Sequence, residues 1–221
     1  MEAYYKTDLT TIYNSSHLEI LKTYPDNHFD LLFTDPPYGI GESGKKNHSR
    51  SKLATTTKFE DFEWDNEIPT EEEFKEMLRV SKKAIIFGGN YFVEYLHNSP
   101  CWIVWDKNNG KTDFADCELA WTNFNTAVRK YKFTWQGMLQ EDMKFKEKRY
   151  HPTQKPLKLY SMILSDYNKE KGLVLDCYAG SFTTAIACEQ LGIKNICIER
   201  EQKYCDIGVK RLNNMQLKFD I

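Results

Sequence analysis

The run of residues 172–176 constrains the fold more than any other segment. Its central Leu-Val-Leu leaves no polar face, which is typical of a parallel strand buried on both sides. A small turn at Gly180 and Ser181 follows, and a helix is expected from about Thr183 until Gly192, a residue suited to end it. A strand, a tight turn and a helix in this order indicate one unit of a parallel sheet.

The rest of the chain repeats this alternation. Compact apolar runs predict strands at residues 29–34, 84–87, 102–105, 118–122 and 195–198. Helices are expected at residues 70–80, 91–97, 156–166 and 204–212, the first opened by a capping box of Thr70 and Glu73. The pattern predicts an α/β fold with a doubly wound, mostly parallel sheet, in which ligands bind at the carboxyl ends of the strands.

Length and composition favour one domain over residues 1–221. A chain of 221 residues with 41% hydrophobic and 28% charged residues suits one α/β core. The apolar runs are too short to span a bilayer, and residues 1–6 lack the layout of a signal peptide. None of the six cysteines forms a C-x-x-C pair, so reduced, buried thiols are expected. We expect a cytoplasmic protein, bacterial or phage-encoded, without membrane contact.

The net charge of −2 conceals two basic segments. Residues 43–58 carry +5 and residues 129–158 carry +6, which leaves −13 for the remainder. The first lies in a polar stretch, residues 39–58, expected to be a mobile loop; the second overlaps an aperiodic aromatic stretch, residues 122–150, expected to be a small insertion. Two basic strips on an acidic body can bind phosphates, although solvated lysine-rich loops would look the same. The basic residues that could contact the phosphates of a nucleic acid are Lys45, Lys46, Arg50, Lys52, Arg129, Lys130 and Lys132.

The sequence Asp35-Pro36-Pro37-Tyr38 follows the strand at residues 29–34. An exocyclic base amine is a poor nucleophile, because its lone pair is delocalised into the ring. The Asp35 carboxylate and the rigidly held Pro36 carbonyl can each accept one N–H bond, which favours a pyramidal nitrogen. Tyr38 offers a flat face to a base extruded from a duplex. A proline turn with no function is the alternative, but this tetrapeptide is rare by chance.

Two further segments suit an anionic nucleoside ligand. After Asp176, small residues let a ligand approach the backbone, and the following helix N-terminus attracts a carboxylate. Glu199 ends the next strand, where an acid can bind ribose hydroxyls. In the segment His151-Pro152-Thr153-Gln154-Lys155-Pro156, Lys155 offers a cation to a carboxylate.

Together these motifs resemble the β class of DNA amino-methyltransferases, in which D-P-P-Y comes first, then a target-recognition region, an H-P-x-x-K-P segment and the cofactor turn. The resemblance covers nearly the whole chain. It implies a Rossmann-like fold with permuted motif order, S-adenosylmethionine as methyl donor, base flipping of double-stranded DNA and no metal. The implied catalytic residues are Asp35, Pro36, Pro37 and Tyr38. The implied cofactor contacts are His151, Thr153, Lys155, Asp176, Tyr178, Ala179, Gly180, Ser181, Phe182, Thr183, Glu199 and Arg200.

Three positions depart from the family pattern. Phe182 stands where glycine is usual, and a bulky residue is expected to disfavour positive φ and to reshape the cofactor pocket. Ser15-Ser16 replaces Gly-Asp, which removes an acidic contact to the cofactor adenine, and Cys117-Glu118 replaces His-Glu.

The resemblance implies site-specific methylation of adenine N6, as in a restriction-modification system, because the aspartate form of the motif is commoner for adenine. The alternatives left open are cytosine N4, RNA or a protein amide as the target, and a weakly active nucleic-acid-binding relative. A dehydrogenase would need a G-x-G-x-x-G turn, which the chain lacks. The short recognition segment predicts a short or relaxed target sequence, with a homodimer as one way to enlarge the footprint.

Overall fold

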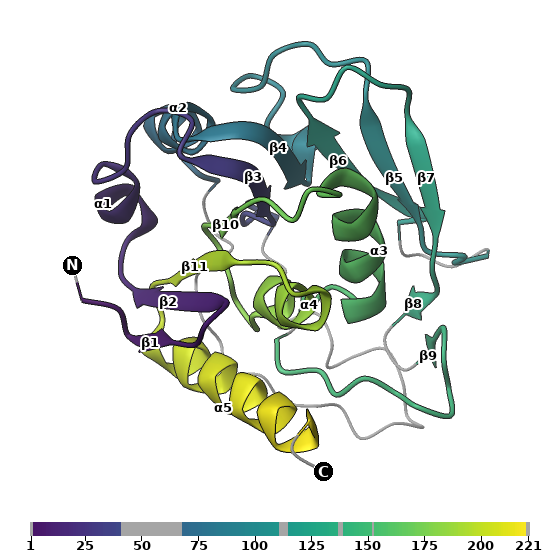
Figure 1. Ribbon diagram of the computed structural model, residues 1–221. Coiled ribbons are helices and arrows are strands. Elements are labelled where there is room, and N and C mark those ends of the chain that lie inside the picture. Colours follow the sequence, from purple (N-terminus) through teal and green to yellow (C-terminus); the bar gives the residue numbers. More distant parts are fainter. Residues whose placement is uncertain (1, 41–67, 111–114, 137–138, 152, 220–221) are drawn as a thin grey trace.

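The computed structural model describes residues 2–40, 68–110, 115–136, 139–151 and 153–219 (Figure 1). The strands are β1 (Tyr5–Lys6), β2 (Thr10–Asn14), β3 (Phe29–Thr34), β4 (Ser81–Phe87), β5 (Trp102–Asp106), β6 (Cys117–Thr122), β7 (Arg129–Lys132), β8 (Trp135–Gln136), β9 (Leu139–Gln140), β10 (Val174–Asp176) and β11 (Asn195–Glu199). The helices are α1 (His17–Leu21), α2 (Glu71–Arg79), α3 (Leu157–Tyr167), α4 (Thr183–Leu191), α5 (Gln202–Phe219) and the 3₁₀ helix η2 (Gly89–Tyr91). Within these residues, no helix is long and apolar enough to cross a membrane.

The main sheet has the strand order β1-β2-β11-β10-β3-β4-β6-β5-β7. The five strands from β2 to β4 in this order are parallel, whereas β6 runs antiparallel to both of its neighbours. The doubly wound, mostly parallel sheet predicted from the sequence is therefore confirmed. Chain order reverses at β10, with β11 on one side and β3 on the other, and such a switch point opens a crevice for a ligand.

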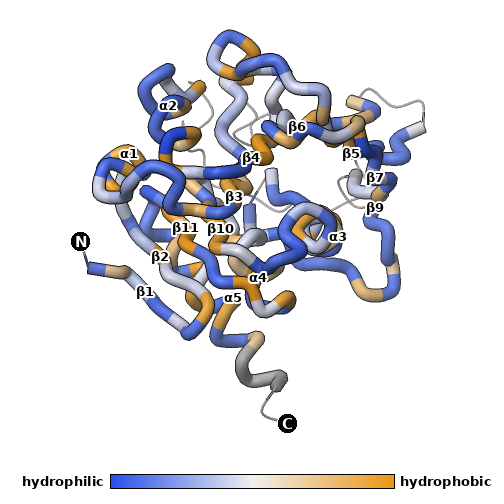
Figure 2. Tube along the Cα trace, turned by 45° about the horizontal axis from the view of Figure 1, so that its top comes forward, coloured by the Kyte–Doolittle hydropathy of each residue, from blue (hydrophilic) through white to orange (hydrophobic). Residues whose placement is uncertain are grey.

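Helices cover both faces of the sheet, because the central strands place apolar side chains on both faces. Leu31, Phe33 and Ile85 pack with α3 and α4, which lie side by side in Figure 1. Leu32 and Ile86 point the other way, toward α1 and α2. Figure 2 shows the hydrophobic residues concentrated on these strands and the hydrophilic ones on the connecting segments. The burial on both sides explains why the strands carry no polar face.

The capping box is present as expected: Thr70 Oγ1 accepts from the backbone N–H of Glu73, and the Glu73 carboxylate accepts from that of Thr70. The expected helix at residues 91–97 is wrong. The chain makes only the turn η2 there, and Phe92 and Tyr95 pack instead on Phe74 of α2. Packing of these rings outweighs the local helical pattern.

Residues 122–150 are only partly an insertion. Arg129–Lys132 forms β7, which pairs in parallel with β5 and extends the main sheet to its edge, while β8 and β9 form a separate two-stranded antiparallel sheet. Alternation is hard to detect in β7 because an edge strand buries few residues, and Tyr131 is its only buried one. The expected loop at residues 39–58 lies almost wholly outside the described residues.

Candidate active site

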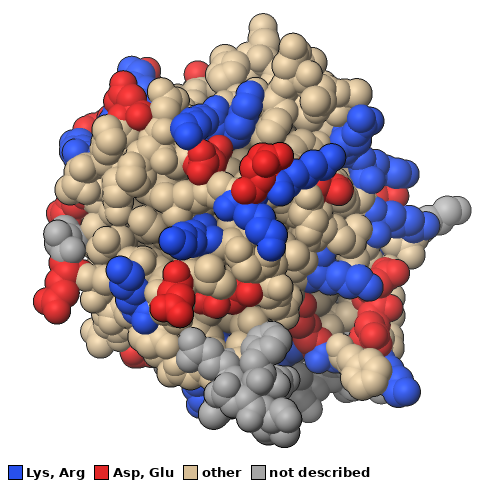
Figure 3. Space-filling model, viewed as in Figure 1, with Lys and Arg blue, Asp and Glu red and all other residues tan. Residues whose placement is uncertain are grey.

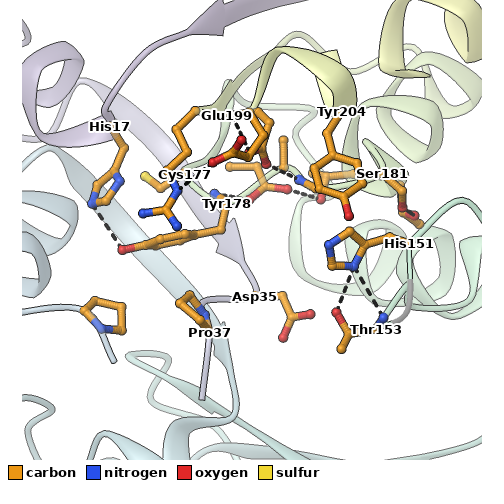
Figure 4. Close-up of a pocket in the computed structure, with 18 of the residues that line it drawn as sticks. His17, Asp35, Pro37, His151, Thr153, Cys177, Tyr178, Ser181, Glu199 and Tyr204 are labelled. Atoms are coloured by element: carbon orange, nitrogen blue, oxygen red, sulfur yellow. Dashed lines mark hydrogen bonds and ion pairs between the residues drawn. The ribbon is translucent and has the colours of Figure 1, made fainter. Parts of the chain in front are cut away.

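One cavity of about 600 Å³ opens at the carboxyl ends of β2, β3, β10 and β11. Figure 4 shows Asp35, His151, Tyr178 and Glu199 around this space. The parallel strands bring these residues to one edge of the sheet, although Asp35 and Asp176 are far apart in the chain. All of the predicted cofactor contacts except Phe182 line the cavity, as do Asp35 and Pro37.

Asp176 shapes the turn that follows β10. One carboxylate oxygen accepts from the Thr34 hydroxyl at 2.9 Å and from the Tyr178 backbone N–H at 3.1 Å, and the other accepts from the Thr184 hydroxyl at 2.6 Å. Burial raises the pKa of Asp176 to about 6, against these hydrogen bonds. Because both oxygens bind the protein itself, the carboxylate fixes β3, the turn and the start of α4 relative to one another.

Glu199 lies across the turn from Asp176. Its carboxylate accepts from the backbone N–H of Gly180 at 2.8 Å and from that of Glu201 at 2.9 Å. Burial raises the pKa of Glu199 to about 7. Gly180 has φ +48°, a conformation that glycine adopts readily, and it turns its N–H toward the acid. Asp176 and Glu199, which were linked by their spacing in the sequence analysis, therefore both line the cavity.

Phe182 corrects an expectation. Its φ is +62°, so the bulky residue does adopt the left-handed conformation that glycine usually supplies. Its ring is fully buried among β2, α4 and α5 and does not line the cavity. Gly208 of α5 makes this possible, since a Cβ there would lie 2.5 Å from the ring. The aromatic ring therefore packs in the protein core and does not enter the cavity.

His17 and Glu73 line the cavity beside Ser16, and neither was predicted as a site residue from the sequence. His17 Nε2 lies 3.1 Å from a Glu73 carboxylate oxygen and 3.1 Å from the Tyr178 hydroxyl. The hydrogen bond from His17 and the capping bonds lower the pKa of Glu73 to about 2 despite partial burial. An acid from α2 thus stands near the serines that replace the family's Gly-Asp. Only the fold brings α1 and α2 together, so no local pattern could have identified the pair.

His151 and Thr153 close another side of the cavity. His151 Nδ1 accepts from the Thr153 backbone N–H at 3.3 Å and lies 3.0 Å from the Thr153 hydroxyl. The His151 ring packs edge-on against Tyr204, 4.7 Å between centroids. Burial, with the charges of Lys155 and Arg149, lowers the pKa of His151 to about 3. The imidazole is therefore neutral at physiological pH.

Lys155 lines the cavity and also contacts the tetrapeptide. Its Nζ donates to Asp35 Oδ2 at 2.5 Å, and the Tyr38 hydroxyl donates to Asp35 Oδ1 at 2.6 Å. Burial raises the pKa of Asp35, opposed by Lys155. Burial would lower the pKa of Lys155, but Asp35 and Glu118 outweigh it and raise that pKa. The half-buried Glu118 has a carboxylate oxygen 3.3 Å from the same ammonium, and this residue was named in the sequence analysis only within a departure from the family pattern.

Tyr38 is also less accessible than expected. Its ring stacks on Tyr91 of η2 at 4.9 Å between centroids and 15° between planes. The left-handed turn at Gly88 permits this, because a Cβ there would lie 2.1 Å from the Tyr38 ring. Tyr91 itself is 44% exposed. A base that stacks on this face of Tyr38 must therefore displace the Tyr91 ring.

The expected DNA contacts are divided between described and undescribed segments. Arg129, Lys130 and Lys132 are exposed on β7, and Figure 3 shows Lys and Arg side chains gathered over β5 and β7. β7 is parallel to β5, so its carboxyl end faces the same edge of the sheet as the cavity. Lys45, Lys46, Arg50 and Lys52 lie outside the described residues.

Comparison with known proteins supports one family. The sequence model of the DNA methylase family matches residues 106–210. Type II methyltransferase M.HinfI from Haemophilus influenzae is 30% identical, over 94% of this chain and 69% of that protein. Type II methyltransferase M2.LlaDCHI from Lactococcus lactis subsp. cremoris is 25% identical, over 95% of this chain and 91% of that protein.

Solved structures share the fold. The crystal structure of the M1.HpyAVI–SAM complex has a TM-score of 0.59 and 24% identity, over 93% of this chain and all of that one. The PvuII DNA methyltransferase, which is cytosine-N4-specific, has a TM-score of 0.62 and 15% identity, over 94% and 87% of the two chains. Because the sequence similarity to M.HinfI extends over nearly the whole chain, the protein belongs to the DNA methylase family.

Proposed function

We propose that this protein transfers a methyl group from S-adenosylmethionine to the exocyclic N6 of an adenine in double-stranded DNA. The observation that carries the proposal is the shared cavity: Asp35 and Pro37 of the tetrapeptide line the same space as Gly180 and Glu199. An amine held at one end would face a donor held at the other. Holding the two reactants at near-attack distance supplies most of the rate enhancement.

The cavity suits the cofactor in size and in chemistry. A volume of about 600 Å³ falls within the range of small-molecule sites. Glu199 would accept hydrogen bonds from the ribose hydroxyls, and the backbone N–H groups at the start of α4 would bind the carboxylate. Tyr178, Ala179, Ser181 and Arg200 line the remaining walls. When bound, the sulfonium would supply an electrophilic methyl group: the sulfur–methyl bond breaks as the nitrogen–methyl bond forms, S-adenosylhomocysteine leaves, and the amine loses one proton.

Asp35 and the Pro36 carbonyl act on the amine. Each accepts one N–H bond, which directs the nitrogen lone pair toward the donor, and the prolines hold the carbonyl in place so that it needs no reorganisation. Pro36 is buried and Asp35 is largely withdrawn from water, where such hydrogen bonds are strongest. The base would stack on Tyr38 after Tyr91 moves aside.

Adenine is favoured over cytosine by the aspartate at position 35, since the family resemblance associates serine there with cytosine N4. Cytosine N4 remains the second candidate. A binding module without activity is the third, and calorimetry separates it, because such a module need not bind S-adenosylmethionine at millimolar concentration.

The three cations of β7 support DNA as the partner. They lie on an exposed edge strand whose carboxyl end faces the cavity edge. A duplex bound there would have its phosphates beside the cations and a flipped base within reach of Asp35. A homodimer would enlarge the footprint of so small a recognition region. We further propose a cytoplasmic location.

Single-molecule sequencing of DNA from a bacterial host that expresses the protein tests the proposal. N6-methyladenine at a defined short sequence is expected, and an Asp35→Ala variant should leave the same sites unmodified. N4-methylcytosine in its place would establish the second candidate. Unmodified DNA from a well-expressed, folded protein would contradict the proposed activity.

A further inference from the structure

Beside the cavity, four charged side chains form an ion-pair network in which positive and negative charges alternate. Lys107 Nζ lies 2.5 Å from Glu118 Oε1, Glu118 Oε2 lies 3.3 Å from Lys155 Nζ, and Lys155 Nζ lies 2.5 Å from Asp35 Oδ2. The four residues come from separate segments: the ends of β3 and β5, the strand β6 and the approach to α3. Lys155 is the most buried, with 6% of its side chain exposed. A buried ammonium must keep a charged partner, since burying it alone is very costly.

In this arrangement both oxygens of Asp35 are occupied. Oδ1 accepts from the Tyr38 hydroxyl and Oδ2 accepts from Lys155. A target amine needs one of these oxygens as an acceptor. Each oxygen keeps a second lone pair, so the amine would share its oxygen with an existing partner, and the charged hydrogen bond from Lys155 is the stronger of the two.

Glu118 offers that ammonium a second partner. Its Oε2 is buried and accepts no hydrogen bond from the described residues, although it lies 3.3 Å from Lys155 Nζ. A buried acceptor without a donor is costly, so a small shift of Lys155 toward it would compensate for a hydrogen bond given up at Asp35. Lys107 already pairs with the other oxygen of Glu118. Burial would raise the pKa of Glu118, but the charges of Lys155 and Lys107 outweigh it and lower that pKa.

We propose that Lys155 is a positioning residue that holds Asp35 oriented and ionised before the target amine binds, and passes its hydrogen bond to Glu118 when the amine is bound. The proposal rests on the proposed function, because it concerns the carboxylate that accepts the amine. The number of buried charges stays constant, and no proton is transferred. Lys155 therefore acts through Asp35 and does not hold the cofactor.

The charge state of Asp35 gives the proposal a signature in pH. Burial raises the pKa of Asp35, and Lys155 is the cation that opposes this rise. Loss of Lys155 would raise that pKa further, and a protonated Asp35 has one acceptor oxygen fewer for the amine. The titratable groups that face Asp35 from the surrounding elements are Tyr38, Glu118, Lys155, Tyr160 and Asp176.

The test measures single-turnover methyl transfer to DNA between pH 6 and 9 for Lys155→Met, Lys155→Arg and Glu118→Gln. Lys155→Met should lower the rate about 100-fold at pH 7 and recover as the pH rises. Lys155→Arg should keep the wild-type pH profile, and Glu118→Gln should lower the rate about tenfold, as loss of a supporting partner does. Lys82→Met is the matched control, since Lys82 pairs with Asp30 on the surface of the molecule.

Calorimetry with S-adenosylmethionine and thermal unfolding accompany the kinetics. Each variant that unfolds cooperatively should bind the cofactor as the wild type does. A weaker cofactor affinity with an unchanged pH profile in Lys155→Met or Glu118→Gln would overturn the proposal. Lys155 would then be assigned to cofactor binding. Wild-type rates in Glu118→Gln would also overturn it. A wild-type protein without methyl transfer would contradict the proposed function itself.

Discussion

The ring of Phe182, held at a φ of +62°, packs directly against the Cα of Gly208, where a Cβ would lie 2.5 Å from it. The residue that ends the cofactor turn is bulky, and a glycine in α5 leaves the room that its ring requires. The backbone of the turn keeps the conformation that a glycine would give, and the Gly180 N–H still points to Glu199. An unusual residue in the cofactor motif is thus matched by a small residue on a distant helix.

This contact predicts that Gly208→Ala changes the free energy of unfolding in opposite directions in the wild type and in a Phe182→Ala background. Gly208→Ala alone should lower the free energy of unfolding by ~1–3 kcal/mol, because the new methyl group overpacks the Phe182 ring. In a Phe182→Ala background the same change should raise it by ~0.5–1 kcal/mol, because alanine favours a helix over glycine. Urea unfolding of the four proteins measures the cycle. Equal effects of Gly208→Ala in both backgrounds would show that the two residues are not coupled.

Glu199 should make cofactor binding depend on pH. A carboxyl with a pKa of about 7 is half protonated at neutral pH, and ribose hydroxyls donate best to the ionised form. The affinity for S-adenosylmethionine should therefore rise from pH 6 to pH 8. Glu199→Gln should bind about 10- to 100-fold more weakly and lose this component of the pH dependence, since it cannot ionise.

Calorimetry at pH 6, 7 and 8 makes the comparison, with Glu199→Asp as the control that keeps a titratable acid at the same position. The same pH dependence in the wild type and in Glu199→Gln would assign it to another group, such as the amine of the cofactor.

Glu73 should stabilise the protein only while it is ionised. Its pKa is lowered to about 2, so its contribution is complete above the unfolded value near 4.5 and is lost as the pH falls through that value toward 2. Glu73→Gln should lower the free energy of unfolding by ~1–2 kcal/mol at pH 6, and the difference from wild type should shrink by ~1 kcal/mol at pH 4. Urea unfolding at both values tests this. Glu72→Gln, which removes only an exposed pair with Lys22, should change little.

The basic side chains of β7 should govern the salt dependence of DNA binding. Changing Arg129, Lys130 and Lys132 together to Ala should weaken binding at all sequences and reduce the slope of log affinity against log salt by up to ~3. Fluorescence anisotropy with a labelled duplex at several salt concentrations gives the slope. Lys6, Lys169 and Lys194, exposed at the opposite edge of the sheet, form the control triple. An equal loss of salt dependence in the two triple variants would mean that the basic residues of β7 contribute no more to DNA binding than other surface lysines.

The sequence predicted those parts of the fold that depend on local pattern. The strand before Asp176, the helix ended by Gly192 and the capping box at Thr70 all follow from neighbouring residues. It also brought Asp35 and Glu199 to one edge of the sheet, because parallel strands align their ends. What it missed depends on packing between distant segments.

Lys155 illustrates this limit. Its partners Asp35 and Glu118 lie 120 and 37 positions away in the chain, and no spacing rule connects them. The ring of Tyr91 over Tyr38 follows from a left-handed turn at Gly88, and the burial of Phe182 follows from Gly208. Each depends on which surfaces the sheet brings together, which a linear pattern does not encode.

The central claim is that Asp35 binds a base amine beside the methyl donor. The most direct measurement incubates purified protein with duplex DNA and S-adenosylmethionine, and then quantifies methylated nucleosides by mass spectrometry. The wild type should form N6-methyladenine. Asp35→Ala should lose at least about 100-fold in rate while its cofactor affinity stays within about threefold of the wild type, as expected for an electrostatic contact made at the reacting centre. N6-methyladenine formed equally fast by the Asp35→Ala protein would contradict the account.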